Sequence, residues 1–154
     1  MEVKIVTFPE TKVVAIEHYG SLGSEHDTVR KLIAWKIENR LLDPLKYRHY
    51  GVHYTDPRVT PPSEYHVDFC ISFEETVGNN IFGVHNKVIP CVRCACVRDI
   101  GSRYSNNAAV YVYDTWLPQS GEAIGDFPIF FHYVNVGPNV CEEDMITDVY
   151  LPLR

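Results

Sequence analysis

The residues of this sequence best suited to chemistry are its cysteines, three of which lie close together. Cys91 and Cys94 have the CxxC spacing of zinc and redox sites, and Cys96 follows. The surrounding run VIPCVRCACV is typical of a buried strand, so Cys91 should point away from the other two. No second CxxC completes a ligand set, and five cysteines, an odd number, favour reduced thiols. We therefore expect Cys91, Cys94 and Cys96 to be small buried hydrophobic residues, with metal or redox chemistry as the alternative, and Cys70 and Cys141 to be reduced like them.

The histidines are the next candidates, and they are scattered: His18, His26, His49, His53, His66, His85 and His132. Along a strand His49 and His53 would lie about 13 Å apart, too far to share one metal ion. The sequence contains neither a nucleophile elbow nor a glycine-rich phosphate loop. We predict no catalytic residue, no metal and no cofactor. A hydrolase, which would need a tyrosine working with a carboxylate, stays an alternative.

The charge balance bears on the partners that the chain would bind. Its 154 residues are 45% hydrophobic and 22% charged, which is typical of one ordinary globular domain. Twenty acidic against 14 basic residues give a net charge of -6, with no basic run, and this disfavours direct binding of nucleic acid. The acidic balance suits a cationic partner or serves solubility.

Hydropathy gives no sign of a membrane protein. No apolar stretch reaches the roughly 20 residues of a membrane span, and the start MEVKIVTFPE lacks the pattern of a signal peptide. We expect a cytoplasmic location and no membrane partner.

An internal repeat organises the chain. Gly20-Ser21 and Gly101-Ser102 lie 81 residues apart, and Trp35 and Trp116 have the same spacing. Near the two ends the offset is 80, between Asp68-Phe69-Cys70-Ile71 and Asp148-Val149-Tyr150-Leu151. The pattern predicts two β-α-β-β units, at about 1–78 and 79–154.

Each unit should contain one helix. Ser24 and Asp27 form an N-cap signature, and apolar residues then recur at helical spacing as far as Leu41, before Asp43-Pro44. The second helix should begin after Ser105 and end before Pro118, although its alternating residues by themselves favour a strand.

The predicted strands are residues 13–19, 47–54, 65–73, 88–97, 129–134 and 146–151. In the third of these, Val67, Phe69 and Ile71 form an apolar face, and Asp68 lies on the other. A helix must cover the apolar face of each half, which leaves the opposite faces free to converge on a groove. The predicted fold is therefore α+β, with antiparallel sheet halves, helices on one face, and a ligand groove between the halves.

Several short motifs carry a resemblance to a known family. They run in order along almost the whole chain: Val13-Val14-Ala15, Gly20, Tyr50-Gly51-Val52, Asp56-Pro57, Thr60-Pro61-Pro62-Ser63-Glu64, Asp68-Phe69-Cys70-Ile71, Trp116-Leu117-Pro118-Gln119-Ser120-Gly121 and Tyr150-Leu151-Pro152-Leu153. In these motifs the chain resembles the GyrI-like, or AraC effector-binding-domain, family. The resemblance implies the tandem fold, a groove between its halves, and binding of amphipathic, often cationic small molecules.

Two departures from the family pattern qualify this expectation. No helix-turn-helix is recognisable, so residues 1–154 look like a single stand-alone effector-binding domain. Regulation of transcription would then need a separate DNA-binding partner chain, and a homodimer is also open. In addition, Phe131 in the run Phe130-Phe131-His132-Tyr133 stands where many family members place a glutamate.

If Phe131, at the family's glutamate position, faces the groove, strand alternation places Tyr133 beside it, and the offset of 81 residues brings Tyr50 to the equivalent place in the first half. The expected aromatic lining is Tyr50, Tyr54, Trp116, Phe131, Tyr133 and Tyr150, whose rings would suit a flat or cationic ligand. The alternative is that these rings only fill the core. A desolvated cation also needs a carboxylate, and the candidates are Asp148, Asp68 and Glu17. The structural alternative for Asp68 is pairing with Arg48 or a turn amide.

The function predicted from these residues and the resemblance is binding of amphipathic, cationic drugs or metabolites, for effector sensing or sequestration. Such multidrug recognition would tolerate many ligand shapes. An inhibitory protein-interaction role, as in relatives that antagonise a topoisomerase, and small-molecule hydrolysis are the alternatives.

Overall fold

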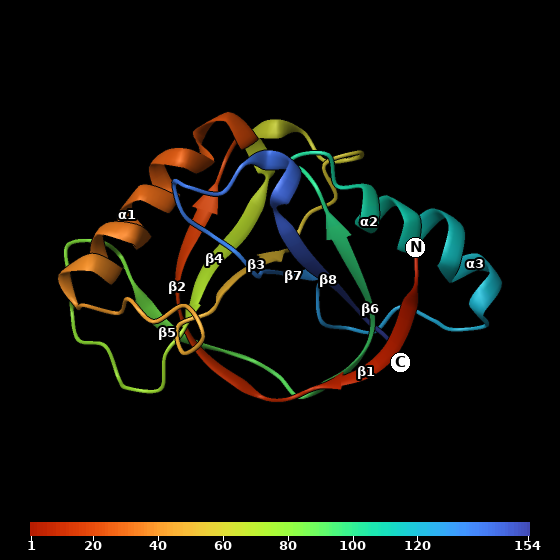
Figure 1. The fold of residues 1–154 in the computed structure, drawn as a ribbon, viewed down its shortest axis with the longest axis horizontal. Coiled ribbons are helices and arrows are strands. Elements are labelled where there is room, and N and C mark those ends of the chain that lie inside the picture. The colour runs from red at the N-terminus through yellow and green to blue at the C-terminus, as the bar shows by residue number, and fades with distance from the viewer. The chain divides into compact units, whose positions relative to one another are not determined.

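The computed structural model describes residues 1–21 and 23–154, and the chain forms two compact units (Figure 1). The α1 unit is Thr11–Ile89, and the α2–α3 unit combines Met1–Glu10 with Pro90–Arg154. In each unit, helices cover one face of antiparallel strands, so the predicted α+β class is confirmed. No helix in the described part of the chain is both long and apolar enough to cross a membrane.

The α1 unit holds four strands and the longest helix. Its elements are β2 (Thr11–Tyr19), α1 (Glu25–Glu38), β3 (His49–His53), β4 (His66–Ser72) and β5 (His85–Ile89). The strands lie in the order β3-β4-β2-β5, and all neighbours are antiparallel. Leu32 and Trp35 of α1 are buried against Val67, Phe69 and Ile71 of β4. Burial of side chains of this size stabilises by about 1.5–3 kcal/mol each, so this apolar face fixes α1 on the sheet.

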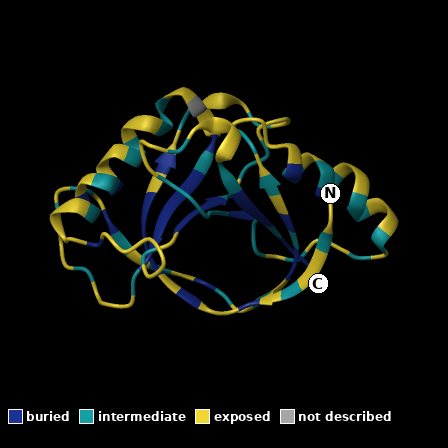
Figure 2. Ribbon diagram, in the orientation of Figure 1, coloured by how far each residue is buried: buried dark blue, intermediate teal, exposed yellow. Residues whose placement is uncertain are grey.

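The α2–α3 unit has a similar plan with a more irregular helix. Its elements are β1 (Val3–Phe8), β6 (Val92–Ile100), α2 (Asn107–Tyr111), a π-helical turn (Val112–Trp116), α3 (Leu117–Ser120), β7 (Phe130–Tyr133) and β8 (Ile146–Pro152). The strand order is β1-β6-β8-β7. Val112 is buried against Val97, Val149 and Leu151. Figure 2 shows buried residues on the strands of both units.

The repeat predicted from the sequence is visible in the order of the elements. A strand, a helix and two strands occur first as β2, α1, β3 and β4, and again as β6, α2–α3, β7 and β8. Short 3-10 turns, Pro62–Glu64 and Glu142–Asp144, precede the last strand of each copy. The predicted β-α-β-β repeat is therefore confirmed at the level of secondary structure.

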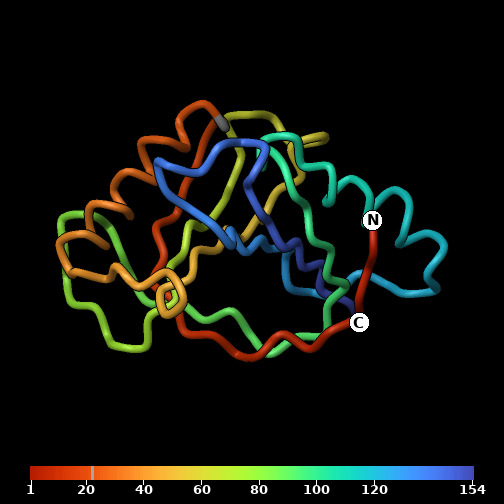
Figure 3. The backbone as a smooth tube through the Cα atoms, in the orientation of Figure 1, coloured from red at the N-terminus to blue at the C-terminus, as the bar shows by residue number. Residues whose placement is uncertain are grey.

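Two further strands were not expected, and they change how the chain divides. β1 pairs with β6, and β5 pairs with β2, so each is an edge strand beside the strand that precedes a helix. The trace in Figure 3 runs from β1 almost directly into β2. β1 nevertheless belongs to the unit that holds Pro90–Arg154, and β5 to the unit that begins at Thr11. The compact units are thus not the two sequence repeats, because β1 and β5 each belong to the unit of the other repeat. One domain made of repeats at about 1–78 and 79–154 stays a prediction.

The expected strand 88–97 is interrupted at Pro90, which separates β5 from β6. Proline cannot donate a ladder hydrogen bond, so a break there is physically reasonable. The expectation that Cys91 is buried is wrong, because Cys91, which precedes β6, is exposed. Cys141 is exposed as well. Cys70 and Cys94 are buried, Cys96 is half-buried, and all five thiols are free.

Helix α1 begins where the sequence predicts but ends earlier. Ser24 is the N-cap residue, yet its hydroxyl donates to the Ser21 carbonyl oxygen at 2.8 Å and not to the helix. The helix ends at Glu38, and Arg40 adopts a left-handed conformation with a φ of 58°. An extension to Leu41 is therefore wrong, although Leu41 is still buried in the core.

The second helical segment continues past the proline that was expected to stop it. Pro118 lies in the first turn of α3, where its missing N–H is tolerated, and the wider π-helical turn comes immediately before. The segment ends at Gly121, whose φ of 75° is a left-handed conformation that glycine adopts without strain.

Candidate functional site

The face of the α1-unit sheet opposite α1 carries a group of polar side chains. Alternation in β4 directs Val67, Phe69 and Ile71 to the helix, as predicted. Asp68 therefore lies on the helix-free face, where the strand register places Glu17 of β2 directly beside it. The same register places His66 beside Tyr19. Four side chains from two neighbouring strands are thus brought together.

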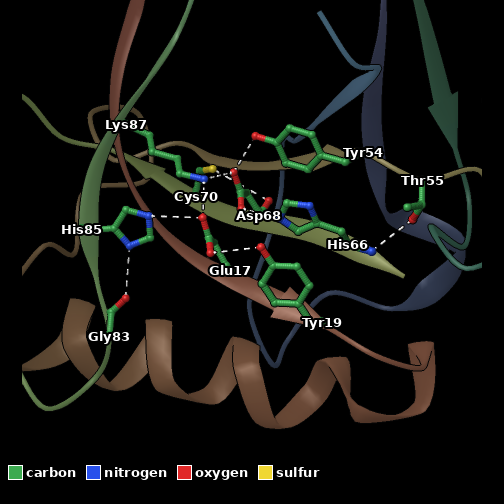
Figure 4. A network of polar contacts seen from close by, with 10 residues as sticks. All are labelled: Glu17, Tyr19, Tyr54, Thr55, His66, Asp68, Cys70, Gly83, His85 and Lys87. Atoms are coloured by element: carbon green, nitrogen blue, oxygen red, sulfur yellow. Dashed lines mark hydrogen bonds and ion pairs between the residues drawn. The ribbon is translucent and has the colours of Figure 1, made fainter. Parts of the chain in front are cut away.

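Asp68 is the centre of this group. It is only 1% exposed, and its Oδ2 accepts hydrogen bonds from the Tyr54 hydroxyl and the Lys87 ammonium, both at 2.7 Å (Figure 4). Burial, followed by the hydrogen bond to Asp68, raises the pKa of Tyr54, so this phenol remains protonated. The partners of Asp68 are therefore Tyr54 and Lys87, and not the Arg48 or turn amide of the structural alternative.

Lys87 joins Asp68 to Glu17. Its Nζ donates to Glu17 Oε1 at 2.9 Å, and Glu17 Oε2 accepts from the Tyr19 hydroxyl at 3.3 Å. Partial burial alone would lower the pKa of the Lys87 ammonium, but the hydrogen bonds to Asp68 and Glu17 raise it. The hydrogen bond from Lys87 lowers the pKa of Glu17. Two carboxylates, those of Glu17 and Asp68, thus share one ammonium, which formally leaves one negative charge in the group.

His66 lies in an aromatic stack above these carboxylates. Its ring is stacked between those of Tyr19 and Tyr54, with centroids 4.3 Å away on both sides and interplanar angles of 14° and 15°. Tyr19 is 63% exposed and Tyr54 40% exposed. The backbone N–H of His66 donates to the Thr55 hydroxyl at 3.1 Å, which fixes the strand on which the ring is carried.

The predicted acid of the α2–α3 unit, Asp148, is fully paired. Arg98 donates to its two carboxylate oxygens at 2.8 and 2.9 Å, in the bidentate geometry that suits a guanidinium. Register places Arg98 of β6 opposite Asp148 of β8. This carboxylate therefore has no uncompensated charge to offer a ligand.

Tyr150 belongs to an aromatic cluster on the helix-free face of the same unit. Its ring stacks on that of Phe130 at 5.0 Å and meets the edge of Phe8 at 5.1 Å. Phe8 in turn contacts Phe130, with ring centroids 4.8 Å apart. Neither phenylalanine was expected at the site.

Three predicted site residues of the α2–α3 unit do not lie on the helix-free face that carries Tyr150. Phe131 is buried in the helix-covered core, with Tyr133 and Trp116 packed against the same cluster. The prediction that Phe131 shares a face with Tyr150 is wrong, because Tyr150 is paired with Phe130 and Phe131 with Val149. The counterpart of Tyr50 in the second copy is therefore Phe130, at an offset of 80 residues and not 81. A shift of one residue sends each side chain of a strand to the opposite face, so Phe130 takes the expected place.

Tyr50 is buried at 2% exposed, and register places it opposite Cys70 on the helix-free face that also carries Asp68. Burial raises the pKa of the Tyr50 hydroxyl. The predicted residues Tyr50, Tyr54, Asp68 and Glu17 thus share one face of the α1 unit. The predicted Asp148 and Tyr150 share one face of the other unit.

Sequence reasoning missed Lys87, Tyr19 and the stacking of His66. Residue 87 was assigned to no strand, and the alternation that places Lys87 beside Glu17 can be applied only once β5 is known to pair with β2. Tyr19 ended a predicted strand, and its alternation with Glu17 was the available signal.

The comparisons with known proteins agree with this fold. The model of the GyrI-like small molecule binding domain matches residues 1–154. The chain belongs to this family. A probable transcriptional regulator of Escherichia coli K12, YgiV, is 34% identical over 154 residues, which cover 99% of this chain and 96% of YgiV. A DNA gyrase inhibitor of Erwinia billingiae is 26% identical, over 99% of this chain and 97% of the inhibitor. This GyrI-like chain is therefore related to the effector-binding domains of regulators.

Solved structures of low sequence identity share the GyrI-like fold. The EcmrR C-terminal domain superposes with a TM-score of 0.77 at 16% identity, covering 99% of this chain and 97% of that one. A Listeria innocua protein described as a hydrolase superposes with a TM-score of 0.69 at 12% identity, covering 99% of this chain and 92% of that one. A third protein, SAV2435, was solved with tetraphenylphosphonium bound. It superposes with a TM-score of 0.56 at 12% identity, covering 100% of this chain and 94% of that one.

Proposed function

We propose that this chain binds amphipathic, cationic small molecules, as an effector sensor or as a protein that sequesters them. The observation that carries the proposal is the charge balance around Lys87. Two carboxylates, Glu17 and Asp68, share one ammonium, and exposed tyrosine rings lie beside them. One negative charge is left for a ligand, next to aromatic surface.

Glu17 is the better contact for the ligand cation. Its side chain is 36% exposed, whereas Asp68 is enclosed and already accepts two short hydrogen bonds. A ligand cation over the exposed face of Tyr19 would gain about 0.5–2 kcal/mol from the ring. The flat surfaces of Tyr19 and Tyr54 accept rings of many shapes, which supports broad specificity.

Two further observations support a cationic ligand. The chain carries a net charge of -6, which attracts cations at long range. One solved protein of the same fold binds tetraphenylphosphonium, a lipophilic cation.

We propose binding without catalysis. Burial raises the pKa of the Cys70 thiol, so Cys70 is not an activated nucleophile. The raised pKa of Tyr54 and its donated hydrogen bond to Asp68 suit a fixed donor better than a base.

A dye titration tests the proposal. Rhodamine fluorescence polarisation should show saturable micromolar binding, and an uncharged dye of the same shape should bind much more weakly. Glu17→Gln should weaken rhodamine binding by about tenfold, the value of one lost charge contact. The matched control is Glu122→Gln, because Glu122 is also paired with a cation, Arg93, but lies in the other unit. Equal affinity of the two dyes would refute the charge argument.

A second candidate function is inhibition of a protein target, supported by the gyrase inhibitor that is 26% identical. A supercoiling assay with purified gyrase tests it. Inhibition at stoichiometric amounts, unaffected by added rhodamine, would favour this function over ligand sensing.

A further inference from the structure

Two buried polar atoms at this site lack hydrogen-bond partners. His66 Nε2 and Asp68 Oδ1 are both inaccessible to solvent, and neither has a partner among the described residues. They face each other at 3.7 Å, which is too long for a hydrogen bond. Leaving a carboxylate oxygen buried and unsatisfied is costly, so a ligand shared by these two atoms would remove that cost.

The spacing of these atoms suits a metal ion. Bond lengths of about 2.0–2.2 Å to nitrogen and oxygen place two ligands of a tetrahedral ion about 3.4 Å apart, close to the observed separation. A carboxylate oxygen of Glu17 completes a set of three donor atoms that all lie within 4.8 Å of one another. One imidazole and two carboxylates are ligands typical of divalent first-row transition ions.

The surrounding residues orient these ligands. The tyrosine rings on both sides of His66 hold the imidazole in one plane, and Nε2 lies at the edge of that plane, where a metal binds. Asp68 Oδ2 is fixed by Tyr54 and Lys87, which leaves Oδ1 free to point toward His66 (Figure 4). Hydrogen bonds of this kind to the second oxygen of a ligating carboxylate are common at metal sites.

We propose that Glu17, His66 and Asp68 form a binding site for a divalent transition-metal ion of the zinc type. The sequence offers no metal motif because His66 and Asp68 lie on one strand and Glu17 comes from another. The exposed group Cys141, Glu143 and Asp144 also brings three donor atoms together, but none of its members is buried. The metal site does not depend on the cationic organic ligand proposed above.

Lys87 sets the affinity of this site. Its ammonium contacts both carboxylates and repels a dication bound to them. We expect this repulsion to exceed the about 10–100-fold that a supporting hydrogen bond contributes to metal affinity, because the ammonium lies next to both ligating carboxylates. The protein should therefore bind metal weakly as it stands, and more tightly when the ammonium is removed.

Calorimetric titration with Zn²⁺ and the visible absorption of added Co²⁺ test the proposal on the whole chain. We expect one saturable site, and a Co²⁺ spectrum typical of low coordination number. His66→Phe keeps the aromatic stack but removes the nitrogen, and it should lower Zn²⁺ affinity by at least about tenfold. Lys87→Met should raise the affinity. A triple variant, C141S/E143Q/D144N, is the control and should bind as the parent does.

The outcomes separate clearly. Zn²⁺ affinity that is unchanged in His66→Phe would overturn the proposal, as would affinity that is lost in the control triple variant. Lys87→Met that binds Zn²⁺ no more tightly than the parent would also overturn it. If circular dichroism shows that His66→Phe does not fold, His66→Gln takes its place with the same expected loss. Failure of rhodamine binding alone would leave the metal result unaffected.

Discussion

The ammonium of Lys87 lies 2.7 Å from a carboxylate oxygen of Asp68, a residue that is 1% exposed. This ion pair joins the edge strand β5 to β4, although β2 lies between them in the sheet. Its polar surroundings, Tyr54 and Glu17, give each charged group more than one partner. The pair therefore contributes both to the stability of the α1 unit and to the charge that its helix-free face presents.

Loss of Lys87 should destabilise the fold. Lys87→Met would leave the buried Asp68 carboxylate without its cation, and we expect the free energy of unfolding in urea to fall by about 3 kcal/mol. The double variant K87M/D68N should recover most of the loss. Arg30→Met is the control, because Arg30 and Asp27 form an exposed pair at 3.7 Å and should contribute less than about 0.5 kcal/mol.

The hydrogen bond from the Tyr54 hydroxyl should contribute more to the free energy of unfolding than an ordinary tyrosine hydrogen bond does. Tyr54→Phe removes a donor to a charged acceptor, with an expected loss of about 2 kcal/mol in unfolding free energy. Tyr65→Phe is matched, since the Tyr65 hydroxyl donates to the neutral carbonyl of Pro57 at 3.1 Å. It should cost about 1 kcal/mol. Equal losses of unfolding free energy in Tyr54→Phe and Tyr65→Phe would show that the charge of Asp68 does not strengthen the hydrogen bond from Tyr54.

Asp148→Asn should leave rhodamine affinity unchanged, in contrast to Glu17→Gln. Arg98 already neutralises Asp148 through two hydrogen bonds, so the carboxylate contributes no net charge to a ligand. The same polarisation titration measures both variants. A loss in Asp148→Asn comparable to that in Glu17→Gln would move the cation contact to the α2–α3 unit.

The stability of the protein should decrease in mild acid because of His53. Burial lowers the pKa of His53 to about 4 from its ordinary 6.5. The unfolded chain therefore takes up a proton as the pH falls below 6.5, whereas the folded chain does not until about pH 4. The stability that neutral His53 provides is complete above pH 6.5 and is lost as the pH falls to about 4.

Urea unfolding at several pH values measures how the free energy of unfolding changes with pH. His53→Gln should flatten this pH dependence between pH 6.5 and 4. A slope that is unaffected in His53→Gln would assign the acid sensitivity to other groups.

The faces of the strands could be predicted from the sequence wherever apolar and polar residues alternate strongly. Val67, Phe69 and Ile71 lie against α1 as expected, and this placed Asp68 correctly on the opposite face. Tyr50, Tyr54 and Glu17 follow from the same alternation. These residues could be assigned because the alternation within each strand is enough to fix the face on which its own residues lie.

Relations between strands were harder to predict. β1 carries mostly exposed or half-exposed residues, so its apolar pattern is weak, and β5 was merged with β6 across Pro90. Lys87 could not be placed without β5. Phe131 was placed in the groove because it occupies the family's glutamate position, and the offset of 81 that linked it to Tyr50 was wrong by one residue, which exchanges the two faces of a strand. Register, unlike alternation, depends on pairing partners that the sequence does not state.

The edge strands β1 and β5 are exchanged between the two β-α-β-β copies. β1 comes before the first copy but pairs with β6 of the second, and β5 comes before the second copy but pairs with β2 of the first. Each copy thus receives its edge strand from the other, so cutting the chain between β4 and β5 would leave β2 and β6 as unpaired sheet edges on the separated pieces.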